Sequence, residues 1–548
     1  MGVCTRPSAV TQRGVDMRRT TAVALVAALG ATSFAAANLR TAPAYAALGA
    51  TSDFNCDGYS DLAVGVPGET VGVVASGIVQ VFWGSDAGLQ PDATVLRIGA
   101  MGATGTGANG DRFGAIVKSG SLDDDTCDDL AVGAPGVDLS NLVDAGVVYV
   151  FYGSAGGFTT NRTSRITRGS KGVPSNNQAG ALFGTALAIG DANGNFIEDL
   201  AIGAPSDDGP TTTNSGSVTV LYEPGETGGG TYDAAWFRMG LGNVAGTPET
   251  NAAFGSALSF GNFNKTSDTD FAQELAIGSP GLNADGMRDS GAVTVLANNS
   301  VGLIAGGSVV LTQNSVGVPG SSEVGDGFGF ALTSGGLLGN DDADDLAVGV
   351  PNEDVGSKID SGNVIVLGGS AQGLVDVVAP PARTLYQGAA GVPDTSETGD
   401  KFGRSLVAAN FSTDAVDVDL AIGVANEDAA GITDAGCVVV MRSSSGSLTS
   451  FNPQLFCQGI GAAPGSAETG DLFGYALSSG DYRGTGANDL AVGAPYEDGS
   501  AATNSGAVTI LNTDGNRLDP AGSGAAVWVQ DTTGVPDTVE ANDKFGTF

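Results

Sequence analysis

The sequence predicts an all-β fold: a seven-bladed β-propeller of four-stranded antiparallel blades whose ring is closed by the C-terminal strand. Three observations lead to this expectation. A phrase of the type Asp-Leu-Ala-Val-Gly-Ala-Pro occurs seven times, and a Phe-Gly pair recurs 70 to 74 residues apart. Each repeat also contains short segments in which apolar and polar residues alternate, as is typical of strands. A fixed period of this length indicates an array of identical supersecondary units.

The two motifs alternate along nearly the whole chain, with most phrases about sixteen residues after a Phe-Gly pair. The phrases begin at Asp61, Asp129, Asp199, Glu274, Asp345, Asp419 and Asp489. The Phe-Gly pairs begin at Phe113, Phe183, Phe254, Phe328, Phe402, Phe473 and Phe545.

The third repeat predicts four short strands. Phe183–Ile189 alternates and ends at a Gly-Asp turn, and Leu200–Ala204 is a short apolar segment that a proline closes. Gly216–Tyr222 is rich in β-branched residues, and Ala235–Met239 supplies a less regular fourth strand. Four strands repeated seven times fit radial packing around an axis. A linear solenoid is the alternative, but it needs distinct capping units and none is visible.

The two ends of the chain complement each other. The first phrase, at Asp61, has no Phe-Gly pair before it in the mature chain, and the last pair, at Phe545, has no phrase after it. We therefore expect the C-terminal strand to complete the first blade of a propeller over residues 47–548, which removes exposed sheet edges. Residues 45–51 lie in register with the missing strand and are the alternative.

Composition and charge exclude several classes of function. The chain has 548 residues, 87 of them Gly, and a formal net charge of −37. Nucleic acid is a poor partner because phosphate binding depends on clustered Lys and Arg. The acidity serves solubility or cation binding. The chain contains no histidine, which removes the usual zinc sites and the Ser-His-Asp and Cys-His catalytic arrangements, and it has no Gly-x-Ser-x-Gly elbow.

The N-terminus is typical of an export signal. Arg18 and Arg19 precede an apolar run over 20–37, and small-residue cleavage sites follow. We predict a signal peptide over 1–46, with Met17 as an alternative start, and a secreted or cell-surface location. A membrane anchor is less favoured because the run is short and contains Gly, Thr and Ser. No later segment predicts membrane insertion.

Four cysteines follow the signal, and an exported chain can keep disulfides. Cys437 and Cys457 fall in successive predicted strands of one repeat, which favours a cross-strand bridge. Cys56 and Cys127 occupy loops of neighbouring repeats, and their pairing stays open because bridging requires Cα atoms within about 7 Å.

The strongest candidate metal ligands lie between the first and second strands of the first repeat. This loop has oxygen ligands at positions 1, 3, 5 and 9 and a glycine at position 6 for the tight turn. Such donors suit Ca²⁺, whereas Mg²⁺ requires a stricter octahedron. The predicted ligands are the side chains of Asp53, Asn55, Asp57 and Asp61 and the backbone carbonyl of Tyr59.

Equivalent loops repeat this donor pattern with less charge, and we predict several structural Ca²⁺ ions. The second loop offers Ser121, Asp123, Asp125, Asp129 and the carbonyl of Cys127. The third offers Asp191, Asn193, Asn195, Asp199 and the carbonyl of Ile197, and the fourth offers Asp268, Asp270 and Glu274. The fifth loop lacks early ligands, the sixth is one residue longer, and the seventh places Arg483 at position 3, where a cation replaces a metal. In loops five to seven, the polar residues are explained without a metal as turn residues whose side chains hydrogen-bond to their own backbone.

Together, the Phe-Gly pair, the Asp-x-Asn-x-Asp-Gly-x-x-Asp loop and the Gly-Ala-Pro phrase resemble the FG-GAP repeats of the integrin α propeller. They are also similar to repeats in secreted bacterial proteins and in glycosylphosphatidylinositol phospholipase D, and the stretch at 391–403 is nearest to the bacterial forms. The resemblance covers essentially 53–548. It implies structural calcium in these loops, on the face opposite the usual ligand surface.

On that opposite face we expect acidic loops, such as those at 352–354 and 397–400. Their carboxylates either accept backbone N–H bonds within turns or form a polyvalent rim for a cationic or carbohydrate partner. Near-identical copies favour the turns, because a catalytic site usually breaks the symmetry of its scaffold.

The predicted function is that of an exported, calcium-binding, monomeric propeller that binds an extracellular protein or glycan without catalysis. The alternative is an enzyme on the propeller, either a phospholipase-like or esterase-like hydrolase or a polysaccharide lyase. A purely structural surface protein is a third possibility. We identify no catalytic residue, so the sequence leans against an enzyme.

Overall fold

A computed structural model places most of the chain, and the predicted signal peptide and the alternative strand at 45–51 lie outside the residues that it describes. The described residues are 52–547 without 228–230, 266–270, 300, 340–342, 375–380, 414–417, 445–446, 449–451 and 500–501.

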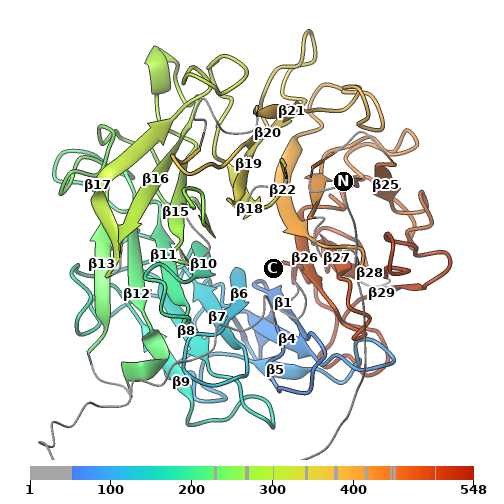
Figure 1. Cartoon of the computed structure of the whole chain (residues 1–548). Helices are drawn as coiled ribbons and strands as arrows, with labels where there is room; N and C mark the ends of the chain where they lie inside the picture. The colour runs from blue at the N-terminus through green and yellow to red at the C-terminus, as the bar shows by residue number, and fades with distance from the viewer. Residues whose placement is uncertain are drawn as a thin grey trace, which may run out of the picture. The chain divides into compact units, whose positions relative to one another are not determined.

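The described residues form seven antiparallel sheets arranged as a ring, which confirms the predicted all-β propeller (Figure 1). Six sheets have four strands in chain order, and the first has three. In the six four-stranded sheets the innermost strands are β6 (Ile116–Gly120), β10 (Ala186–Gly190), β14 (Ala257–Gly261), β18 (Ala331–Gly335), β22 (Phe402–Ala409) and β26 (Ala476–Gly480). The acidic phrases form the next strands, β1 (Leu62–Val66), β7 (Asp129–Ala134), β11 (Asp199–Ala204), β15 (Glu274–Ser279), β19 (Asp345–Val350), β23 (Asp419–Val424) and β27 (Asp489–Ala494).

Two further layers complete each blade. The third strands are β4 (Ile78–Phe82), β8 (Val147–Phe151), β12 (Ser217–Tyr222), β16 (Ala292–Asn299), β20 (Asn363–Leu367), β24 (Cys437–Met441) and β28 (Ala507–Leu511). The outermost are β5 (Thr94–Leu96), β9 (Thr163–Ile166), β13 (Asp233–Phe237), β17 (Gly302–Leu311), β21 (Arg383–Leu385), β25 (Gln454–Cys457) and β29 (Ala525–Trp528). The remaining elements are a hairpin of β2 (Thr70–Val71) and β3 (Val74–Ala75) and two 3₁₀ turns, η1 (Pro224–Thr227) and η2 (Ala284–Gly286).

Two strand boundaries predicted in the third repeat were wrong. The first strand begins at Ala186 rather than Phe183, because Leu182 and Gly184 have φ angles of 53° and 88° and form a turn. The fourth strand ends at Phe237 rather than Met239, because a turn begins at Arg238, whose carbonyl accepts the N–H of Leu241 at 3.2 Å.

The Phe-Gly turn joins each blade to the blade before it. Gly255 donates its N–H to Gly278 of its own blade at 3.0 Å, while Phe254 donates to Ser215 of the preceding blade at 3.2 Å. The carbonyl of Gly255 lies against Gly203 of the preceding blade, so closely that a Cβ at Gly203 would collide with it. A glycine in the phrase is therefore what allows the next blade to approach.

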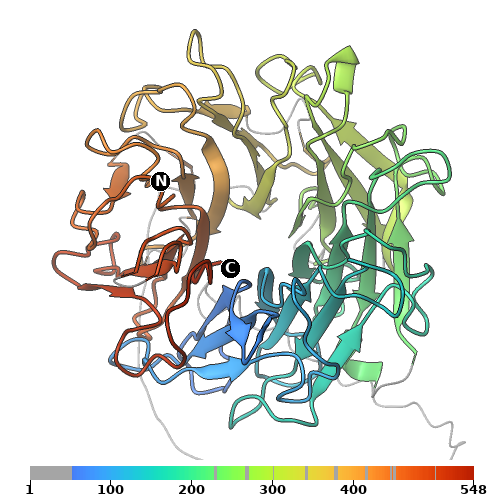
Figure 2. The ribbon, with the colours of Figure 1, turned by 180° about the vertical axis from the view of Figure 1, so that it is seen from behind.

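The C-terminal residues close the ring in the predicted manner. Gly65 of β1 donates its N–H to the carbonyl of Thr547 at 2.7 Å, and Phe545 donates to Ser505 at 2.9 Å. The ring of Phe545 is fully buried 6.2 Å from that of Phe82, and Phe82 in turn contacts Trp528 of the last blade at 4.6 Å. The C-terminus accordingly lies at the centre of the ring beside β1 and β26 (Figures 1 and 2).

The hydrophobic cores lie between blades rather than within them. The core at the seam, for example, combines Leu62 and Val64 of the first blade with Val508 and Trp528 of the last. Burying one such side chain contributes about 1.5–3 kcal/mol, which makes each blade dependent on its neighbour. No helix within the described residues is both long and apolar enough to cross a bilayer.

Candidate metal-binding loops

The predicted calcium loops lie together at the ends of the blades, where each innermost strand turns into the next strand. In the first loop, Asp53 accepts the N–H groups of Asp57 at 3.0 Å and Gly58 at 2.8 Å. Asn55 accepts the N–H of Asp57 at 3.0 Å, and Asp57 accepts that of Tyr59 at 3.0 Å. These bonds turn the side chains at positions 1, 3 and 5 toward the inside of the loop, and Gly58 supports the turn with a φ of 93°.

The acidic residue at position 9 connects three segments of its blade. Asp61 is buried, and its two oxygens accept the N–H of Phe54 at 2.9 Å and that of Gly84 at 2.8 Å. Asp129 and Asp199 hold the equivalent backbone groups in their blades. We had assigned these residues to metal binding alone. The structure gives them a structural role as well, which a carboxylate with two lone pairs on each oxygen can combine with ligation.

The donor set of the first loop fits a hard cation. Burial and, to a smaller extent, the charges of Asp53 and Asp57 raise the pKa of Asp61 to about 8, although the hydrogen bonds from Gly84 and Phe54 oppose the shift. Among the ion pairs of the described residues, none involves these three carboxylates. A bound Ca²⁺ would supply the positive charge that this loop otherwise lacks, with Asp53, Asn55, Asp57, Asp61 and the carbonyl of Tyr59 available to hold it.

The second loop already has a cation beside it. The guanidinium of Arg162 contacts Asp123 at 2.6 Å and Asp125 at 2.8 Å, and it also donates to the carbonyl of Gly153 at 2.7 Å. A calcium ion at Ser121, Asp123, Asp125, Cys127 and Asp129 would therefore have to displace Arg162. Sequence reasoning did not find this pair, because Arg162 lies far along the chain beyond the loop.

The third and fourth loops are described to different extents. Asp191 accepts four backbone N–H groups, at 2.7 to 3.2 Å, and Asn195 accepts the N–H of Ile197 at 2.9 Å. In the fourth loop, Asp268 and Asp270 lie outside the described residues, and Glu274 is buried and accepts the N–H of Phe263 at 2.9 Å.

In the seventh loop, the guanidinium of Arg483 contacts the position-9 carboxylate, as the sequence predicts for a side-chain cation that replaces a metal ion. The guanidinium donates to Asp489 at 2.8 and 3.2 Å. The seventh loop therefore neutralises its position-9 carboxylate without an ion, and it offers a natural comparison for the first loop.

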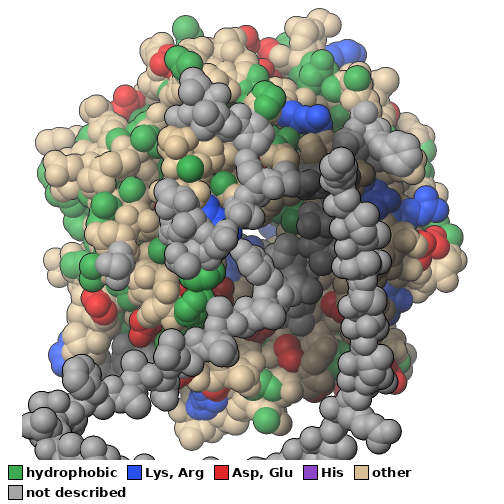
Figure 3. Space-filling model, viewed as in Figure 1, with side chains coloured by type: hydrophobic (Ala, Val, Ile, Leu, Met, Phe, Trp, Pro, Cys, Tyr) green, Lys and Arg blue, Asp and Glu red, His purple; other side chains and the backbone are tan. Residues whose placement is uncertain are grey.

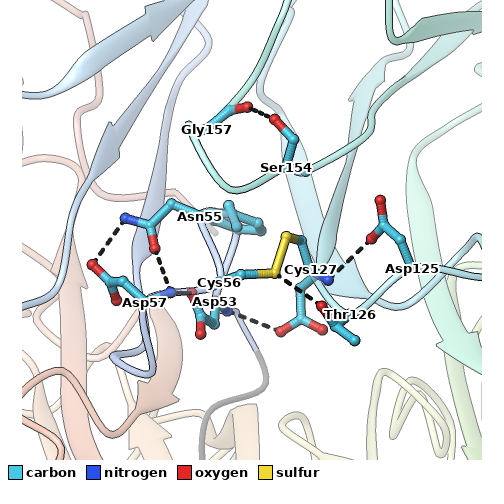
Figure 4. The surroundings of a disulfide bond; sticks show 12 residues. Asp53, Asn55, Cys56, Asp57, Asp125, Thr126, Cys127, Ser154 and Gly157 are labelled. Carbon is cyan, nitrogen blue, oxygen red and sulfur yellow. Dashed lines mark hydrogen bonds between the residues drawn. A yellow bond between two sulfur atoms is a disulfide. The ribbon is translucent and has the colours of Figure 1, made fainter.

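Both cysteine pairs form disulfides. Cys56 bridges to Cys127 with Cα atoms 5.0 Å apart, which links the first and second loops covalently. Figure 4 shows this bond between the loops, with Asn55 and Asp57 on one side of it and Asp125 on the other. Cys437 and Cys457 face each other directly in neighbouring strands, with Cα atoms 4.3 Å apart.

A belt of hydrogen bonds also joins neighbouring loops, and sequence reasoning missed it. The N–H of Asp128, at position 8, donates to the carbonyl of Asp53 at 3.0 Å, while the N–H of Asp53 donates to the carboxylate of Asp128 at 2.9 Å. The same reciprocal pairing joins Ser121 with Glu198, Asp191 with Gln273, and Asp481 with Ser60 across the seam. These pairs link the first four loops in order and the seventh loop to the first.

On the opposite face, the acidic side chains stabilise turns and blade junctions. Asp400 accepts the N–H of Glu397 at 2.5 Å, and Asp428 accepts that of Asp434 at 3.0 Å. This confirms the structural interpretation of these carboxylates. Four glutamates further accept a side-chain N–H from a glutamine of the preceding blade: Glu69 from Gln530, Glu353 from Gln313, Glu427 from Gln387 and Glu497 from Gln458.

The sequence carries a signal for these junctions that we did not use. Each of the four glutamines lies six residues before a proline, and Arg168 occupies that position in the second repeat. Arg168 makes a buried bidentate pair with Asp207, with both distances at 2.8 Å. The glutamine or arginine at the end of one blade therefore hydrogen-bonds to the acidic side chain that follows the second strand of the next blade.

One group of three acidic side chains in the described residues has oxygens within 4.8 Å of one another, and it lies outside the predicted loops. It consists of Glu69, Glu540 and Asp543 at the seam of the ring. Sequence reasoning did not find it, because its members lie at opposite ends of the chain.

The centre of the ring contains a cavity of about 300 Å³ lined mainly by the innermost strands. Lys118 of β6 lines it together with hydroxyl groups such as those of Ser259 and Ser334. The corresponding positions of β10 and β22 are Ala188 and Val407, so the lysine breaks the symmetry of the ring. The lysine side chain is exposed to solvent within the cavity, and desolvation by the surrounding strands lowers the pKa of its ammonium group.

Comparisons with known proteins agree with this architecture. The FG-GAP repeat family matches residues 44–82 and 183–221. Over 165 residues the chain is 37% identical to phosphatidylinositol-glycan-specific phospholipase D of Rattus norvegicus, covering 29% of this chain and 19% of that protein. It is 29% identical over 249 residues to integrin alpha-PS2 of Drosophila melanogaster, covering 44% of this chain and 15% of the relative. The match thus spans less than a fifth of either relative.

The buried glutamates of the blade junctions predict a pH dependence. Burial raises the pKa of Glu427 from 4.5 to about 8, although Gln387 opposes the shift. The folded state therefore retains this proton when the unfolded chain has lost it, and stability falls as pH rises from about 4.5 to about 8. Glu427→Gln keeps an acceptor for Gln387 and removes the charge, so it should gain about 1–3 kcal/mol over the parent at pH 9 and little at pH 4.

Urea unfolding at the two pH values measures this difference. The control is Glu397→Gln, an exposed carboxylate of the same junction, whose charge contributes least among the causes of the raised pKa of Glu427, so it should weaken the pH dependence only slightly. A Glu427→Gln variant whose stability follows pH as the parent does would contradict the assignment.

Proposed function

Because this chain is a seven-bladed β-propeller that carries FG-GAP repeats, we propose that it is an exported, calcium-stabilised recognition module that binds an extracellular protein or glycan without catalysis. The two disulfides support the extracellular setting, since such bonds persist in oxidising compartments. The observation that carries the proposal is the distribution of exposed apolar side chains.

These side chains gather at loops on the face opposite the candidate metal loops. Val73, Val143 and Ile359 lie at the tips of the loops between second and third strands and are 89%, 59% and 58% exposed. Val316 and Val324, in the loop that enters the fifth blade, are also exposed. Single exposed apolar side chains are ordinary, so the support for an interaction surface comes from their concentration on one face.

The loop tips are held in place by the neighbouring blade. The carbonyl of Val143 accepts the N–H of Gly180 at 2.8 Å, and that of Ile359 accepts the N–H of Gly399 at 3.0 Å. A tip fixed through its backbone presents its side chain with little loss of conformational entropy on binding. Figure 3 shows hydrophobic side chains dispersed among other side chains on the coloured part of one face of the molecule. Because the exposed tips belong to several blades, they suit a large partner that touches more than one blade.

An enzyme on the propeller is the second candidate, and Lys118 is the observation in its favour. A lysine in a central cavity lined by hydroxyl groups can bind an anionic substrate or act as a base when its pKa is lowered. The regular acidic residues outside the cavity are occupied in turns and junctions, which favours recognition over chemistry.

Binding screens separate the two candidates. The full chain is presented to arrays of glycans and matrix proteins, beside esterase, phospholipase and lyase substrates. Val143→Asp and Ile359→Asp should weaken binding about tenfold or more, since charge at a hydrophobic contact is costly. The control Val301→Asp, 78% exposed at the turn between β16 and β17 on the other face, should leave it unchanged. Turnover that Lys118→Met abolishes would overturn the recognition proposal.

Calcium should stabilise the propeller. Chelation should lower the melting temperature and Ca²⁺ should restore it. A ligand present at a hundred times its Kd adds about 2.7 kcal/mol per site to the free energy of unfolding. Asp53→Asn should reduce this gain. The control is Asp481→Asn, which alters position 1 of the seventh loop, where Arg483 replaces the metal. Identical melting with chelator and with Ca²⁺ would refute the calcium proposal.

A further inference from the structure

The seam of the ring contains three carboxylates that the candidate loops do not include. Glu69 follows β1 of the first blade, and Glu540 and Asp543 precede the closing Phe545. One oxygen of each lies within 4.8 Å of the other two. Glu69 and Asp543 are 0% and 1% exposed, and Glu540 is half-buried. We call these three residues the seam cluster.

The seam cluster has no positively charged partner within the described residues. Lys544, next to it in the chain, directs its ammonium over the ring of Tyr496 at 5.0 Å instead. The chain has no histidine that could serve. Three close carboxylates therefore repel one another in a largely buried place, where the interaction is strong.

Two buried oxygens of the cluster lack hydrogen-bond partners, which is the second and independent observation. Glu69 accepts the side-chain N–H of Gln530 on one oxygen at 2.6 Å, and Asp543 accepts the N–H of Glu540 on one oxygen at 2.6 Å. The other oxygen of each, Oε1 of Glu69 and Oδ1 of Asp543, is buried and unpartnered. A buried acceptor without a partner costs about 1–3 kcal/mol, and a bound cation would remove that cost for both oxygens.

We propose that the seam cluster binds a divalent cation of the Ca²⁺ class and thereby joins the last blade to the first. Two Ca–O bonds of about 2.4 Å let one ion reach oxygens up to about 4.8 Å apart, and the oxygens of the cluster lie within that distance of one another. Gln530, from the last blade, donates a hydrogen bond to Glu69 and so orients it, as hydrogen-bonding neighbours commonly orient metal ligands. This site is separate from the candidate metal-binding loops and lies on the other face of the ring.

A matched pair of substitutions tests the seam cluster. Glu540→Gln removes one ligand charge but keeps the backbone N–H that donates to Asp543. Glu468→Gln is the control, because the N–H of Glu468 donates to Asp471 at 2.6 Å in the same way, at the junction of the sixth and seventh blades. Calorimetric titration of the full chain with CaCl₂ should show one tight site fewer in Glu540→Gln, or one weakened about tenfold or more. Glu468→Gln should bind like the parent.

The same titration distinguishes this site from the loops. Asp53→Asn should leave the seam site intact, and Glu540→Gln should leave the loop sites intact, so each proposal can fail alone. Asp543→Asn serves as a second seam variant and should lose the same site. Equal stoichiometry and affinity in the parent and both seam variants would overturn the proposal, as would an equal loss in Glu468→Gln.

Discussion

The fold depends on one contact, which is made between the Phe-Gly turn of each blade and the phrase glycine of the blade before it. At Gly203 and Gly255 the two backbones lie so close that no side chain fits between them. Hydrophobic cores such as the one at the seam lie between blades, so this contact sets the spacing at which those cores form. Because every blade needs a neighbour on both sides, the ring must also close.

The same geometry separates the molecule into two faces. On one face, neighbouring loops pair reciprocally, as Asp53 and Asp128 do, and the Cys56–Cys127 disulfide links the first two loops. On the other, the junction glutamates are held by glutamines such as Gln387, and apolar loop tips project to solvent. The reciprocal loop pairs therefore lie on one face, and the junction glutamates, the apolar loop tips and the seam cluster lie on the other.

Much of the fold was predictable from the sequence, because the contact between blades is encoded at a fixed spacing. The repeat predicts the seven blades, and the unmatched motifs at Asp61 and Phe545 predict that the two ends of the chain close the ring. Pairs between distant residues were not predictable: the ion pair of Arg162 with Asp123 and the approach of Glu69 to Asp543 depend on how the ring brings separate segments together. The metal loops remain a prediction, since their oxygens also serve the backbone.

Removal of the closing strand tests the account most directly. A chain that ends at Lys544 keeps the seam cluster but loses Phe545 and the partner of Gly65. We predict a loss of about 3 kcal/mol or more in the free energy of unfolding, because a buried phenylalanine alone is worth that much. A truncated chain that unfolds at the same urea concentration and temperature as the full chain would contradict closure by the C-terminal strand.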